Sequence, residues 1–75
     1  MELNEFIANF ADQFEDTPAE EITADADFKE FDEWDSLTAL AIIGMVKTNY
    51  DKNITGREIR ACNTVEDLFN LVASK

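Results

Sequence analysis

The chain has 75 residues, enough for one domain over residues 1–75, and its 17 acidic and 6 basic side chains give a formal net charge of −11. The absence of histidine and the single cysteine exclude a Ser-His-Asp triad, an internal disulfide, a histidine metal site and a cysteine-only zinc site. The charge argues against nucleic acid, whose phosphates it would repel. No apolar run is long enough to span a bilayer and no export signal opens the chain, so we expect a soluble, cytoplasmic monomer.

Apolar residues near the start of the chain recur with the 3.6-residue period of an amphipathic α-helix. Polar residues occupy most of the positions between them, and the apolar ones are Leu3, Phe6, Ile7, Phe10 and Phe14. This pattern predicts a first helix over about residues 2–14, with one apolar face turned toward the core.

The next segment, residues 15–35, is predicted to be a long irregular loop. Residues 1–35 contain 13 acidic residues and one basic residue, whereas residues 36–75 contain four acidic and five basic ones. Thr17 and Pro18 predict a short turn of helix, with Thr17 as its cap. A loop of this length in a compact domain needs contacts with the core. We expect them from its large apolar residues, which are Ile22, Phe28, Phe31 and Trp34.

A second helix is predicted over about residues 36–50, because Asp35 and Ser36 are both good N-cap residues and no helix breaker follows until Gly44. Further apolar residues lie on its remaining sides, and those at helical spacing are Leu37, Leu40, Ile43, Val46 and Tyr50. A helix that is apolar nearly all round is normally buried in the middle of a fold. We therefore expect this helix to be central.

Two shorter helices are predicted in the last third of the chain. One covers about residues 56–61 and turns Ile59 inward. The other covers about residues 65–73, where Thr64 is a good N-cap and Asp67 completes a weak variant of the capping box. The predicted fold is therefore all-α, a small four-helix bundle with three main helices, one short helix and a long loop between the first two helices.

The residues that indicate chemistry are Asp35, Ser36 and Leu37, at the start of the second helix. The first turn of a helix offers unpaired N–H groups and the positive end of the helix dipole, so a phosphate ester on Ser36 would lie where anions are favoured. Ser36 has no base beside it, because the chain lacks histidine and the nearest lysine in sequence is Lys29. It is therefore a poor nucleophile by itself and is well suited to be modified by another enzyme.

In these features the chain resembles the acyl carrier proteins and the related peptidyl carriers. The resemblance rests on the length, the negative charge, the four predicted helices and three segments, which are Asp35-Ser36-Leu37, Tyr50-Asp51-Lys52-Asn53-Ile54 and Asn63-Thr64-Val65-Glu66-Asp67-Leu68. It implies that Ser36 receives 4′-phosphopantetheine from coenzyme A, and that Asp35 assists recognition by the phosphopantetheinyl transferase and its magnesium. By the same resemblance the chain is a carrier and not an enzyme, and its arm holds acyl groups as thioesters for acyl-transferring and acyl-modifying enzymes.

The chain departs from that family at positions that bear on its partners. Fatty-acid-synthesis carriers usually have a row of acidic residues on the second helix, whereas the partner-facing residues expected here are Thr38, Leu40, Ala41, Gly44 and Lys47. None of these is acidic, which favours a specialised lipid, polyketide or related pathway with more apolar docking. Glu33 stands where the family usually has glycine. We expect Trp34 to pack against the loop, and a position beside the prosthetic arm is the alternative. We expect Cys62 to be a small buried apolar residue, and a reactive thiol is the alternative.

Other interpretations remain open. An acidic helical protein that inhibits an enzyme with a basic active site would also explain the net charge, but not why the run of acidic residues stops at Ser36. Within the carrier class, an aminoacyl or peptidyl carrier fits the same residues. The pair Asp35-Ser36 is also compatible with an ordinary helix cap that has no chemical role.

Overall fold

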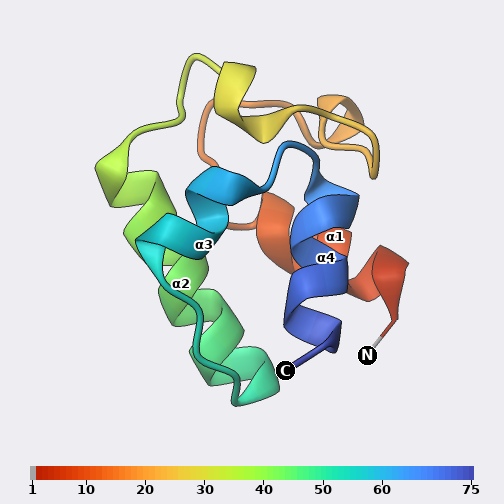
Figure 1. The fold of residues 1–75 in the computed structure, drawn as a ribbon. Coiled ribbons are helices and arrows are strands. Elements are labelled where there is room, and N and C mark those ends of the chain that lie inside the picture. The colour runs from red at the N-terminus through yellow and green to blue at the C-terminus, as the bar shows by residue number, and fades with distance from the viewer. Residues whose placement is uncertain (1) are drawn as a thin grey trace.

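Four α-helices and two 3₁₀ turns form the fold of the computed structural model, which describes residues 2–75 (Figure 1). In chain order they are α1 (Leu3–Ala11), η1 (Ala19–Glu21), η2 (Phe28–Glu30), α2 (Ser36–Tyr50), α3 (Gly56–Ala61) and α4 (Val65–Ala73). The predicted all-α class and small helix bundle are confirmed. None of the described helices is both long and apolar enough to cross a membrane.

The first helix is shorter than predicted. Glu2 caps it, because its carboxylate accepts hydrogen bonds from the backbone N–H groups of Asn4 and Glu5 at 3.0 and 2.9 Å. The helix ends at Ala11 because the backbone then tightens, and the N–H of Phe14 donates to the carbonyl of Ala11, three residues back, at 3.0 Å. Phe14 is nevertheless buried, so the apolar stripe continues beyond the end of the helix.

The hydrophobic core lies where α1 packs against both α2 and α4, and α3 packs against α2. Its largest fully buried side chains come from all four helices and from the loop before α2, and they are Phe6, Phe10, Phe28, Ile42, Ile59, Leu68, Val46, Val65 and Val72. Aromatic contacts connect α1 to that loop, since the ring of Phe10 lies 5.2 Å from Phe14 and 5.6 Å from Phe28 between centroids.

The loop between α1 and α2 lies across one end of the bundle, at the top of Figure 1, and its apolar residues attach it to the core. Ile22 and Phe28 are buried, and Phe31 and Trp34 are partly buried against the same cluster. Trp34 packs edge to face against Phe28 with ring centroids 4.8 Å apart. The expectation that these four residues anchor the loop is therefore confirmed, as is the packing role expected for Trp34.

Backbone contacts connect the same loop to the start of α4. The N–H of Val65 donates to the carbonyl of Ala26 at 3.2 Å. Near this contact, Asp27 and Thr64 form an isolated antiparallel bridge. The loop is thus fixed from both sides, by core packing and by hydrogen bonds to a helix that lies far along the chain.

The helical turn predicted near the start of the loop forms as η1. Pro18 occupies its cap position, and no side chain caps it. The prediction of Thr17 as the cap is wrong, because the Thr17 hydroxyl forms its hydrogen bond with Glu33 instead.

The second helix has the predicted bounds, but it is not central. Its buried residues are Thr38, Ile42, Met45 and Val46, whereas Leu37 and Leu40 are 76% and 62% exposed. One side of α2 packs against α1 and α3, and the other side is open to solvent. The expectation of a central helix is wrong, because the composition of a helix that is apolar on all sides does not select the buried face. Leu40 is exposed, as expected for a residue predicted to face a partner.

Helices α3 and α4 have the predicted bounds, and each begins with a reciprocal capping box. Thr55 Oγ1 accepts the N–H of Glu58 at 3.1 Å, and Glu58 Oε1 accepts the N–H of Thr55 at 3.0 Å. Thr64 and Asp67 form the same arrangement at the start of α4, with both distances 3.1 Å. Ile59 lies inward as predicted and is 1% exposed.

Candidate functional site

Asp35 and Ser36 begin α2, where the sequence predicts the site. Asp35 is the N-cap residue, and its Oδ1 accepts the backbone N–H of Thr38 at 2.8 Å. Ser36 is the first residue of the helix and is exposed, and its hydroxyl forms no hydrogen bond with any residue from 2 to 75. The chain's other serine differs, because Ser74 Oγ donates to the carbonyl of Leu71 at 2.7 Å. Ser36 is therefore the serine with an accessible, unoccupied hydroxyl.

Thr38 does not face a partner, because it is only 9% exposed. Its Oγ1 lies 3.1 Å from the carbonyl oxygen of Glu33 and 3.1 Å from Asp35 Oδ1. These contacts turn the threonine inward and close the turn that leads into α2. The prediction of an exposed Thr38 is therefore wrong, and the residue instead holds the backbone on both sides of Ser36.

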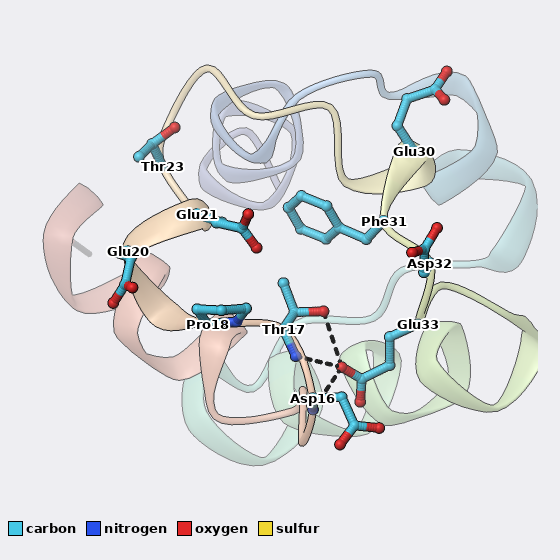
Figure 2. Close-up of a pocket in the computed structure, with 10 residues that line it drawn as sticks. All are labelled: Asp16, Thr17, Pro18, Glu20, Glu21, Thr23, Glu30, Phe31, Asp32 and Glu33. Carbon is cyan, nitrogen blue, oxygen red and sulfur yellow. Dashed lines mark hydrogen bonds between the residues drawn. The ribbon is translucent and has the colours of Figure 1, made fainter.

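Glu33, at the position where the resemblance leads us to expect glycine, connects the chain after α1 to the segment that precedes Ser36 (Figure 2). Its carboxylate accepts hydrogen bonds from the N–H groups of Glu15, Asp16 and Thr17 at 2.7, 2.9 and 3.0 Å. The Thr17 hydroxyl donates a fourth bond at 3.0 Å. These bonds, first among them the one from the N–H of Glu15, hold the pKa of Glu33 below its ordinary value of 4.5. Glu33 is thus a charged anchor for the loop.

The sequence offers no signal for this role of Glu33. Its partners lie 16 to 18 residues earlier, beyond the range of any local capping pattern. Figure 2 shows the carboxylate beside a hollow between the two arms of the loop, which is lined mainly by acidic side chains, namely Asp16, Glu20, Glu21, Glu30, Asp32 and Glu33. Across residues 2–75, no group of three or more acidic or sulfur side chains is arranged to hold a metal ion.

A pocket of about 270 Å³ opens beside Ser36, between the start of α2 and α3. Its walls combine apolar and charged side chains, which are Trp34, Asp35, Ser36, Ala39, Gly56, Ile59 and Arg60. Trp34 and Ile59 provide apolar surface, and Arg60 provides a positive charge. The sequence does not connect α3 with Ser36, because only the packing of α3 against α2 brings them together.

The exposed side of α2 presents apolar and small residues next to Ser36. Leu37 and Leu40 are the large apolar side chains that the described part of the chain leaves exposed. Gly44 and Lys47 are exposed further along the same side, and Ala41 is half-buried at its edge. The exposed side of α2 therefore has no acidic side chain between Ser36 and Lys47.

Cys62, at the end of α3, is buried as expected for a small apolar residue. Burial raises the pKa of its thiol, and the nearby carboxylate of Asp67 raises it further. A thiol that stays protonated is a poor nucleophile. Cys62 is thus part of the core and does not contribute to the site.

The chain matches the family model described as "Phosphopantetheine attachment site" over residues 4–72. It belongs to this family. No curated protein and no solved structure matches the chain significantly. The prosthetic group of the family is 4′-phosphopantetheine, so the protein is a carrier of that group, and the resemblance to the acyl carrier proteins is confirmed.

The residues around the start of α2 fit this group. Ser36 offers an exposed hydroxyl for a phosphate ester, and the unpaired N–H groups of the first helical turn favour its negative charge. The pocket beside Ser36 offers apolar walls from Trp34 and Ile59 and a cation, Arg60. When bound, the group supplies a flexible arm that ends in a thiol.

Proposed function

We propose that Ser36 is the attachment residue and that the protein is an acyl carrier, whose arm holds acyl intermediates as thioesters for partner enzymes. The observation that supports this most directly is the exposed Ser36 hydroxyl at the first position of α2, directly after the capping Asp35. Ser74, by contrast, lies beyond the last turn of α4, and its hydroxyl already donates a hydrogen bond.

The residues around Ser36 explain why a separate transferase must attach the arm. Asp35 Oδ1 already accepts the N–H of Thr38 and lies 3.1 Å from its hydroxyl, and the chain has no histidine. A transferase therefore supplies the base that takes the proton of Ser36 as the serine oxygen bonds to the phosphorus of coenzyme A next to the pantetheine. The pyrophosphate P–O bond at that phosphorus breaks, and adenosine 3′,5′-bisphosphate leaves. Asp35 Oδ2 remains available for recognition by that enzyme and its magnesium. The carrier itself raises the effective concentration of one tethered intermediate.

Intact-mass measurement tests the proposal. After incubation with coenzyme A, magnesium and a broad-specificity phosphopantetheinyl transferase, the wild type gains the mass of one phosphopantetheine. Ser36→Ala keeps its helical circular dichroism spectrum and gains none, whereas the matched control Ser74→Ala is modified like the wild type. Modification of folded Ser36→Ala would overturn the assignment. A wild type that stays unmodified would instead favour the acidic inhibitor.

We also propose that the partners belong to a specialised lipid, polyketide or related pathway of the cytoplasm, and that the carrier acts as a monomer. Between Ser36 and Asp51 the sequence contains no acidic residue. A partner with a basic docking patch finds no complementary charge on α2, whereas an apolar patch finds Leu37 and Leu40 exposed. The same surface suits an aminoacyl or peptidyl carrier, which is the alternative within the class.

A set of variants with added negative charge tests which kind of partner enzyme the carrier uses. The holo-carrier is loaded by a transacylase of fatty acid synthesis, and the rate is compared with that of the double variant Ala41→Glu, Lys47→Glu. The control Arg57→Glu, Asn70→Glu has the same change in net charge on α3 and α4. We expect the α2 variant to load faster and the control to load like the wild type. Equal rates for all three would return ordinary fatty acid synthesis as the leading pathway.

A further inference from the structure

Arg60 lines the pocket beside Ser36 without an acidic partner of its own. Among residues 2–75 the ion pairs join Lys47 to Asp51 at 3.1 Å and Lys75 to Glu58 at 2.7 Å, and neither includes Arg60. Arg60 shares this lack of an ion pair with Lys29, Lys52 and Arg57, but among these four it is the residue that lines the pocket beside Ser36. The guanidinium is therefore available to an anion that the protein itself does not supply.

The guanidinium of Arg60 lies next to Gly56 at the pocket. Gly56 lies one helical turn before Arg60, and a Cβ atom at Gly56 would lie 3.4 Å from Arg60 Nη1. The guanidinium thus lies beside Gly56, within van der Waals contact of the position that a Cβ atom would take. Both residues line the pocket together with Ser36, so the positive charge lies at the same opening as the serine hydroxyl.

We infer that Arg60 binds the phosphodiester of the prosthetic arm on Ser36, an inference that rests on the proposed attachment at that residue. A phosphodiester on Ser36 adds a negative charge to a pocket that already contains the carboxylate of Asp35. Arg60 is the basic residue among those that line the pocket. Its planar set of N–H donors matches the geometry of phosphate oxygens, which makes arginine a preferred phosphate ligand.

A purely structural role for Arg60 would have a different signature. Arg60 lies in the last turn of α3, where a cation interacts favourably with the helix dipole. That interaction is the same before and after modification of Ser36. Phosphate binding acts only in the holo form. The decisive quantity is therefore the difference between the apo and holo forms of each variant, and not the stability of either form alone.

The experiment compares the wild type, Arg60→Gln and the matched control Arg57→Gln, which removes the same charge from an exposed position of the same helix outside the pocket. Intact mass and peptide mapping first establish that each protein has one arm on Ser36. Nitrogen-15 spectra of the arginine side chains, phosphorus-31 spectra and melting curves are then recorded for apo and holo forms at low salt, where screening is weakest.

We expect the Nε–Hε signal of Arg60 to shift between the apo and holo wild type while that of Arg57 does not. The phosphorus-31 signal should move in holo Arg60→Gln and remain in place in holo Arg57→Gln. The Arg60→Gln substitution should lower Tm more in the holo form than in the apo form, by a difference of roughly 2–5 °C, and added salt should reduce this difference.

Each other outcome has a distinct meaning. If the arm is absent from Ser36 in every protein, the proposed function and this inference are both wrong. If all three proteins are modified at Ser36 but Arg60→Gln behaves like Arg57→Gln, only the binding of the phosphodiester by Arg60 is wrong. A response of Arg60 that appears only after a carboxylate-bearing acyl group is loaded would assign the residue to the cargo, and would likewise overturn the inference.

Discussion

The loop before Ser36 and the two short helices after α2 are stabilised by contacts of very different range. The loop depends on Phe28 in the core and on Glu33, whose hydrogen-bond partners lie 16 to 18 residues away. Helices α3 and α4 begin with capping boxes whose members are three residues apart. A segment rich in acidic residues is thus attached to the rest of the fold through distant anchors, whereas helices with local caps form their ends from neighbouring residues.

The largest expected effect comes from removing the core anchor of the loop. Phe28 is fully buried, so Phe28→Ala should lower the free energy of unfolding by about 3–5 kcal/mol, which is most of the stability of a domain this small. Leu40→Ala, on the 62% exposed side chain in α2, should change it by less than about 0.5 kcal/mol. Urea unfolding measures both. Similar losses for the two variants would contradict the assigned burial.

Acid should weaken both regions through the carboxylates that accept hydrogen bonds. The pKa of Glu33 is lowered first by the N–H of Glu15, that of Glu58 first by its hydrogen bond with Lys75, and that of Asp67 first by the N–H of Thr64. Since these pKa values are lower when the chain is folded, their stabilisation is complete at neutral pH and is lost as pH falls through the folded-state values.

We therefore expect Tm to fall between about pH 5 and pH 3. The fall should be smaller in Glu33→Gln, which lacks one of the three groups. A Tm that rises steadily over this range would show that relief of repulsion within the acidic loop outweighs the lost hydrogen bonds.

Substitutions at Glu33 and at its neighbour Asp32 distinguish the effect of charge on stability from the effect of the hydrogen bonds. Glu33→Gln replaces an acceptor-only carboxylate with an amide whose N–H₂ group opposes the donors of residues 15–17, so Tm at pH 7 should fall by several degrees. Asp32→Asn removes the same charge from the neighbouring position, and its Tm should be unchanged or slightly raised. Thermal melts of both variants test this. Equal losses of Tm would show that net charge, and not the hydrogen bonds, determines the effect.

A smaller effect is expected from salt. Residues 15–35 contain ten acidic residues and one lysine, so their mutual repulsion opposes folding. Raising the ionic strength from about 0.01 to 0.15 M shortens the screening length from about 30 to 8 Å, and Tm should rise. Millimolar magnesium should act in the same direction. A Tm that is independent of ionic strength would indicate that the acidic side chains are already well separated.

The smallest expected effect lies in α2. Gly44 is exposed, and a Cβ atom added to it would meet no atom within 4 Å. Gly44→Ala should therefore raise the free energy of unfolding by about 0.5–1 kcal/mol. If the holo variant is more stable but is loaded more slowly by its partner enzymes, Gly44 provides close approach for a partner. If loading is unchanged, the glycine has no such role.

Several features of this protein were determined by nearby residues and could be predicted from the sequence. The bounds of α2, α3 and α4 agree with the prediction, because N-cap residues such as Asp35 and Thr64 define helix starts over a span of three residues. The family followed from Asp35-Ser36-Leu37 and its surroundings, and the comparison over residues 4–72 supports it. These features depend on local geometry and on spacing along the chain, which the sequence shows directly.

Only the tertiary structure decided which faces and which distant residues meet. It turned Thr38 inward and left Leu37 exposed, because the packing partners of α2, and not its composition, select the buried side. It also brought Glu33 to the backbone after α1, and Arg60 to the pocket beside Ser36. Such contacts arise when elements far apart in sequence pack together, and a single sequence has no periodicity or spacing that records them.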